Sequence, residues 1–99
     1  MVSISIVSYP PESAKELGKR FLGLPPIPEY ITVVGPYATS EIQEGIQAYT
    51  IYKYDKSKAA EALEAITNVH LAFYGVPGYT FSIKLASSAA TSLKMLGLE

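Results

Sequence analysis

The longest continuous run of strand-favouring residues in this chain is Ile42–Tyr54, and it constrains the fold more than any other segment. A strand with one face in water alternates apolar with polar side chains. This run places large side chains on both faces: Ile42, Ile46, Ala48, Thr50, Tyr52 and Tyr54 on one, and Gln47, Tyr49, Ile51 and Lys53 on the other. The pattern therefore predicts a central strand that is covered on both sides.

The residues before this run predict a strand, a helix and a second strand. Val2–Tyr9 alternates strictly, which indicates a strand. Pro11 suits the first turn of a helix that ends near Gly23, because the missing N–H is not needed there. Tyr30–Val34 favours a strand, which Gly35-Pro36 interrupts as in an edge strand or a bulge. Ala38–Glu41 is expected to form the polar tip of a hairpin.

The residues after the run predict a helix, a strand and a final short helix. Asp55 is the expected cap of an amphipathic helix centred on Ile66, which Gly75 ends. Tyr79–Leu85 alternates as a strand does. Ser87–Leu96 favours a short helix that packs on a sheet edge, on a partner or at the end of the domain, through four apolar residues: Ala89, Ala90, Leu93 and Leu96.

This order of elements, β-α-β-β-α-β with a short C-terminal helix, predicts one α+β domain over residues 1–99. Right-handed crossovers interleave the two βαβ halves into an antiparallel sheet of order 4-1-3-2, with both long helices on one face. The expected architecture is the ferredoxin-like sandwich. Its uncovered face is expected to carry Ser3, Ser5, Val7, Thr80, Ser82, Lys84 and one side of the third strand.

Composition narrows the classes of function. Charged residues make up 17% of the chain, against a usual value of about 25%, so a partner is expected to cover part of the surface. The sequence leaves two alternatives for the uncovered face: it is exposed to water, or it packs face to face against a second copy in a homodimer. A net charge of -1 without a basic block argues against nucleic-acid binding. The chain has no cysteine and no apolar run of about 20 residues, so we expect a cytoplasmic protein without a membrane span.

Two short motifs add a family resemblance: Gly35-Pro36-Tyr37 before the hairpin and Pro77-Gly78-Tyr79 before the last strand. With them, the β-α-β-β-α-β core resembles the dimeric α/β-barrel superfamily. That family includes cofactor-free monooxygenases of antibiotic biosynthesis, stress-responsive barrel proteins and muconolactone isomerase-like proteins. The resemblance implies a homodimer. The monooxygenases' Asn, Trp and Arg sets have no match in this sequence, so no catalytic residue is carried over.

The candidate ligand-binding residues are His70, Tyr52, Tyr49 and Phe73. His70 lies on the apolar side of the second helix, where it is either a buried structural histidine or a polar group of a cavity that binds a ligand or serves as a general base. Neither a metal nor a cofactor is expected. The leading interpretation is a small homodimer that binds an apolar or aromatic ligand or serves as an interaction module. The alternative is a cofactor-free monooxygenase or isomerase that acts on a small aromatic molecule.

Overall fold

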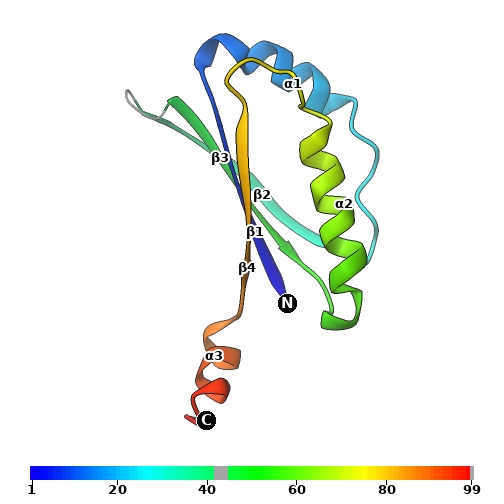
Figure 1. Ribbon diagram of the computed structural model, residues 1–99, viewed down its shortest axis with the longest axis vertical. Helices are drawn as coiled ribbons and strands as arrows, with labels where there is room; N and C mark the ends of the chain where they lie inside the picture. Colours follow the sequence, from blue (N-terminus) through cyan, green and yellow to red (C-terminus); the bar gives the residue numbers. More distant parts are fainter. Residues whose placement is uncertain (42–44, 99) are drawn as a thin grey trace.

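The computed structural model describes residues 1–41 and 45–98, and this part of the chain forms an α+β fold with one antiparallel sheet (Figure 1). Single 3₁₀ turns, Pro11–Ser13 and Lys56–Lys58, precede the first two α-helices. The elements in chain order are β1 (Val2–Tyr9), α1 (Ala14–Leu22), β2 (Thr32–Glu41), β3 (Gly45–Lys53), α2 (Ala59–Leu71), β4 (Thr80–Ala86) and α3 (Ala89–Met95).

The four strands are hydrogen-bonded in the order β2-β3-β1-β4. Counted from the β4 edge, this is the order 4-1-3-2 that the sequence predicts. The two central strands, β1 and β3, are antiparallel, with Ser5 opposite Thr50. On its other side β1 pairs with β4, where Ser5 lies opposite Ile83. Directly opposite residues share a face of the sheet, so this register fixes which side chains lie beneath the helices.

The second strand is longer than its sequence predicts. Pairing of β2 with β3 shifts between Val34 and Tyr37 and then resumes as far as Glu41. The expectation that Ala38–Glu41 is a hairpin tip is therefore wrong. Pro36 lacks a donor, but it lies on an edge strand at the irregularity, where the ladder tolerates the loss. The first three residues of the predicted third strand, Ile42 to Glu44, lie outside the described residues.

Polar contacts fix the start of α2 and the relative position of the two long helices. Asp55 caps the 3₁₀ turn that leads into α2 rather than α2 itself: its carboxylate accepts a 2.9 Å hydrogen bond from the Ser57 backbone N–H. The Arg20 guanidinium of α1 donates to the carbonyl oxygens of Ala72, at 3.3 Å, and Tyr74, at 2.7 Å. These two carbonyls follow α2, so Arg20 ties the two helices together at one end.

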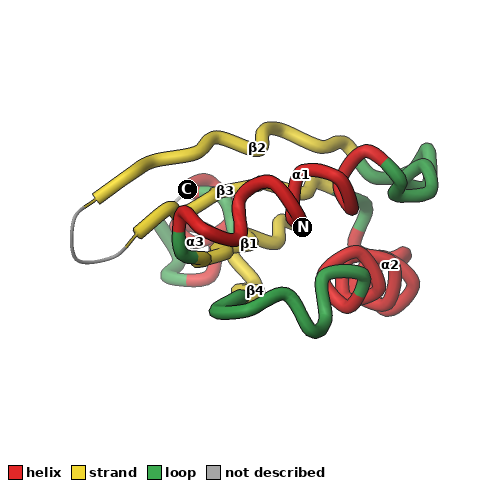
Figure 2. The backbone as a smooth tube through the Cα atoms, turned by 90° about the horizontal axis from the view of Figure 1, so that it is seen from above, coloured by secondary structure: helices red, strands yellow, loops and turns green. Residues whose placement is uncertain are grey.

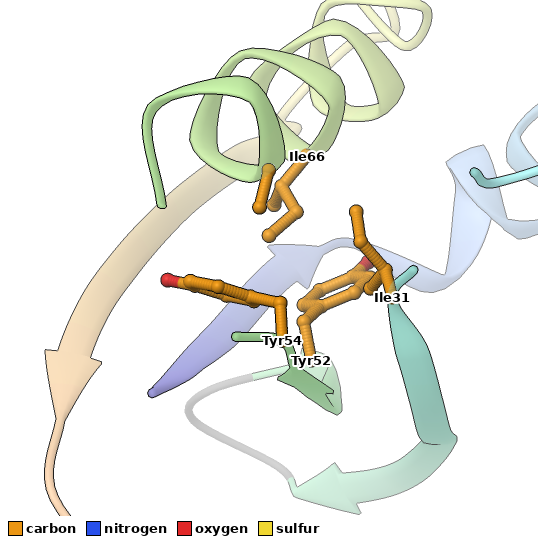
Figure 3. Packing of buried hydrophobic residues seen from close by; sticks show 5 residues of the cluster. Ile31, Tyr52, Tyr54 and Ile66 are labelled. Atoms are coloured by element: carbon orange, nitrogen blue, oxygen red, sulfur yellow. The ribbon is translucent and has the colours of Figure 1, made fainter. Parts of the chain in front are cut away.

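The hydrophobic core lies beneath α2 (Figure 3). Ile66 of α2 is 0% exposed and points at Tyr52 and Tyr54, which come from the end of β3 and the residue just after it. Ile31, directly before β2, packs beside them. By contrast, no residue of α1 is buried. The core is therefore concentrated under one helix, and α1 lies over a part of the sheet that it does not seal.

The two faces of β1 are reversed relative to the sequence-based expectation. Ser3 and Ser5 are 0% and 1% exposed, whereas Ile4 and Ile6 are only partly buried. The Ser3 hydroxyl bonds the Tyr54 hydroxyl, and the Ser5 hydroxyl bonds His70 of α2, each at 2.5 Å. The prediction that Ser3, Ser5 and Val7 lie on the uncovered face is wrong, because buried hydrogen-bond partners outweigh the apolar alternation of the strand.

Two parts of the molecule project from this body. The β2–β3 hairpin extends on the side opposite α2 (Figure 2). The C-terminal helix α3 lies beyond the end of β4, away from α1 and α2 (Figure 1), and none of its residues is buried. The Cα radius of gyration is accordingly 15.1 Å, whereas about 13 Å is expected for a compact domain of this length.

Candidate functional site: a cavity between the sheet and helices α1 and α2

A cavity of about 490 Å³ lies between the inner face of the sheet and the two long helices. Val7, Ala48 and Thr50 of the central strands form its floor, and Leu17 and Phe21 of α1 line another wall. The floor residues Val7 and Ala48 lie opposite each other in the β1–β3 ladder. Because both are short, they leave space beneath α1 that larger side chains would fill.

The cavity wall is apolar and carries no formal charge. Among the described residues that line it there is no aspartate, glutamate, lysine or arginine. Its polar groups are hydroxyls and one imidazole, contributed mainly by Ser5, Thr50, Tyr52, His70 and Tyr79. A fixed charge on a ligand would lose its hydration here without gaining an opposite charge, which is strongly unfavourable. The wall therefore suits an uncharged molecule that is largely apolar.

His70 is held in one orientation by two hydrogen bonds. Its Nδ1 lies 2.7 Å from the carbonyl oxygen of Ile66, one turn earlier in α2, and must donate because a carbonyl can only accept. In the neutral ring, Nε2 is then the acceptor, and the Ser5 hydroxyl donates to it at 2.5 Å. Burial lowers the pKa of His70 below 6.5, and the bond to Ile66 opposes this shift. The imidazole is therefore neutral at pH 7.

Two tyrosines of the cavity remain protonated over the whole physiological range. Burial raises the pKa of Tyr52, although a hydrogen bond with Thr50 opposes the shift. Burial and the nearby Tyr52 raise the pKa of Tyr79. In the described part of the chain, the Tyr79 hydroxyl is also the one buried side-chain polar atom without a hydrogen-bond partner. Such an atom has lost its hydration without compensation, which costs about 1–3 kcal/mol.

The structure brings three of the four predicted ligand-binding residues together. His70, Tyr52 and Phe73 all line the cavity. Tyr49 does not, because it lies opposite Ile6 on the outer face, where its hydroxyl donates to Gln47 Oε1 at 3.0 Å. Sequence reasoning missed Ser5. No local signal marks Ser5, because its hydrogen-bond partner, His70, lies 65 residues away in α2.

Neither a metal site nor a membrane span is found in the described residues. Within residues 1–41 and 45–98, no three His, Cys, Asp or Glu side chains gather closely enough to hold a metal ion. No helix in these ranges is long and apolar enough to cross a bilayer. The side chains that line the cavity can make hydrogen bonds and apolar contacts, and the imidazole of His70 can transfer a proton.

Comparisons with known proteins do not place the chain in a family. No family model matches the sequence, and no curated protein matches it. Two solved structures align over 88% of this chain. The de novo designed protein Foldit4 is 14% identical, with 94% of its chain covered and a TM-score of 0.49. A DUF3240 family protein from Shewanella baltica OS155 is 11% identical, with 91% covered and a TM-score of 0.35.

Proposed function

We propose that this chain is a homodimeric binding protein for a small, uncharged, mainly apolar molecule. The observation that carries the proposal is the cavity of about 490 Å³, which lies within the range of about 300–1,000 Å³ for small-molecule sites. His70, Tyr52 and Phe73 form part of its wall. An aromatic ligand would pack against Phe73 and Tyr52 and would direct its polar atom toward the hydroxyls.

A competition assay with a neutral fluorescent naphthalene ketone (prodan) tests ligand binding. We expect 2-acetylnaphthalene to displace this probe and the anion 2-naphthoate to displace it at least about 100-fold less well, because an unpaired charge would be buried. Ala48→Phe fills the cavity floor and should abolish binding. Ala60→Phe, on the exposed side of α2, is the matched control. Equal binding by both variants, or tighter binding of the anion, would refute a neutral site between the sheet and the helices.

The homodimer is proposed through the outer face of the sheet, as in the dimeric α/β-barrel superfamily and its ferredoxin-like subunit. Register places Ile4, Ile6, Ile51 and Tyr49 together on this face, and neither long helix covers it. The chain exposes 6,814 Å², whereas a compact monomer of 10.7 kDa exposes about 5,500 Å². The excess of roughly 1,300 Å² is larger than the ~800 Å² that each partner contributes to a standard interface.

Light scattering on a sizing column tests the dimer. We expect a mass near twice 10.7 kDa for the wild-type chain and a monomer for Ile51→Glu, which adds a charge to the centre of the outer face. Ala60→Glu adds the same charge to the exposed side of α2 and should remain dimeric. A monomeric wild-type chain at micromolar concentration would remove the dimer from the proposal and leave the binding cavity.

The absence of cysteine from all 99 residues also supports a cytoplasmic location.

A second candidate function is cofactor-free catalysis, such as a monooxygenase or isomerase reaction on a small aromatic substrate. The specific observation in its favour is the orientation of His70, whose neutral Nε2 is an acceptor at the cavity wall. A neutral imidazole can act as a general base here through Ser5, whose hydroxyl passes its proton to Nε2 while its oxygen takes the proton of a bound phenol or an activated C–H group. His70→Gln should abolish turnover yet retain ligand binding if this is correct. Loss of binding alone would assign His70 to recognition.

A further inference from the structure

The C-terminal helix α3 has hydrogen-bonded caps at both ends, although none of its described residues is buried. At its start, the Ser88 hydroxyl accepts a 3.1 Å hydrogen bond from the Thr91 N–H. At its end, the Leu98 N–H donates to the Leu93 carbonyl at 2.8 Å, and the Gly97 N–H donates to the Lys94 carbonyl at 2.9 Å. Gly97 has φ +77°, so these bonds form a Schellman motif. The sequence thus specifies both boundaries of this helix.

One side of α3 is apolar and exposed to solvent. On a helical wheel, Ala89, Ala90 and Leu96 fall within about 60° of Leu93. Leu93 and Leu96 are 45% and 73% exposed, and Leu98, which the Schellman motif brings back toward Leu93, is 62% exposed. Isolated helices shorter than about 12 residues are marginal in water, and this one has seven residues. Its capping residues therefore define a helix that needs an apolar surface to pack against.

Within the described part of the chain, no surface buries any residue of α3. The helix extends beyond the end of β4 (Figure 1), and the neighbouring Leu85 is itself 59% exposed. The excess accessible surface of roughly 1,300 Å² includes this arm and exceeds what one partner contributes to a standard interface. In a two-fold dimer each chain both donates and receives such an arm, so the same apolar residues are buried in both copies.

We infer that residues 87–98 form a C-terminal arm whose Leu93 face packs against a second copy of this chain. This inference rests on the homodimer proposed above and adds a second contact to it, separate from the outer face of the sheet. Of the three placements that the sequence leaves open for this helix, it selects the partner. The arm adds exposed apolar area beyond the end of β4, next to Leu85.

Two single substitutions in the full-length chain test the arm. Leu93→Glu and Ser92→Glu each add one negative charge to the same exposed helix at adjacent positions. We expect Leu93→Glu to weaken dimerisation at least about 100-fold, because it buries an unpaired carboxylate, and Ser92→Glu to leave it unchanged. Light scattering over a dilution series measures both. Equal dissociation of the two variants would overturn the inference.

The sheet variant Ile51→Glu separates failure of the arm from failure of the dimer. If Ile51→Glu dissociates and Leu93→Glu does not, the arm inference is overturned and the sheet-face dimer stands. If only Leu93→Glu dissociates, the arm is supported and the sheet-face contact is not. A wild-type monomer overturns both. Hydrogen exchange adds a measurement without substitutions: amides of residues 91–98 should lose protection on dilution, and protection independent of concentration would contradict the inference.

Discussion

The single histidine of this chain should make its stability acid-sensitive in a defined pH window. His70 is 3% exposed, and burial lowers its pKa below 6.5. The folded chain therefore binds fewer protons than the unfolded chain below pH 6.5. Stability is complete above pH 6.5 and declines as the pH falls from there through the folded pKa. No aspartate, glutamate, lysine or arginine among the described residues lines the cavity around the ring to alter this sign.

The size of the effect follows from proton linkage. If the folded imidazole takes up no proton between pH 7.0 and 5.5, an unfolded histidine of pKa 6.5 costs the native state at most about 1.3 kcal/mol over this interval. With a urea m-value of about 1–3 kcal/mol/M, this upper limit corresponds to a fall of the unfolding midpoint by about 0.4–1.3 M. Urea titrations followed by circular dichroism at fixed protein concentration measure the shift, because the stability of a dimer depends on concentration.

His70→Gln is the control for this experiment, since glutamine keeps a polar side chain but does not titrate. The nine aspartates and glutamates are common to both proteins, so the difference between the two pH profiles belongs to His70. We expect the variant to be less stable at pH 7.0 and to lose less stability on acidification. The same change of midpoint in both proteins would refute the assignment of the acid response to the buried imidazole.

Three further substitutions test the packing. Tyr79→Phe removes the unpartnered buried hydroxyl and should raise the free energy of unfolding by about 1 kcal/mol, with a thermal midpoint about 4–8 °C higher; a lower midpoint would mean that the hydroxyl has a partner. Ile66→Ala opens a cavity between α2 and the buried tyrosines Tyr52 and Tyr54, and should lower the free energy of unfolding in urea by about 2–5 kcal/mol. A loss below about 1 kcal/mol would contradict a core centred on Ile66. Gly78→Ala should lower the thermal midpoint more than Gly75→Ala. Both glycines have positive φ, but a Cβ at Gly78 would lie 2.5 Å from Pro10 Cδ, whereas a Cβ at Gly75 would meet nothing within 4 Å. Equal midpoints would refute the close approach between Gly78 and Pro10.

The order of elements was predictable because each carries a local signal. The alternation of Val2–Tyr9, the cap at Asp55 and the apolar side around Ile66 are all visible in the sequence and all appear in the structure. The large side chains on both faces of β3 indicated a central strand, and β3 is central. Right-handed crossovers then leave few topologies for two βαβ halves.

The faces of β1 and the lining of the cavity were not predictable in the same way. Hydropathy favours Ile4 and Ile6 inside. No local signal shows that Tyr54, after β3, and His70, in α2, bond the serine hydroxyls of β1. Likewise, Gly35-Pro36 signals an interruption, but only the pairing partner decides whether the strand resumes afterwards, as it does at Tyr37. Helix and strand periodicity fix the sides of His70, Phe73 and Tyr52, and all three line one cavity. The same periodicity puts Tyr49 on the opposite side of its strand from Tyr52, so counting it among the cavity residues was wrong.

The inward serines of β1 have a consequence for how this chain avoids misfolding. Sliding β1 by one position would exchange its two sets of side chains, sending the isoleucines under α2 and the serines to the exterior. Burial of the isoleucine side chains away from water would by itself favour that shifted arrangement. What opposes it is a pair of hydroxyl contacts, Ser3 with Tyr54 and Ser5 with His70, that no slipped alignment can reproduce. In this protein polar groups select the correct strand alignment, and the isoleucines of β1 lie on the outer face of the sheet.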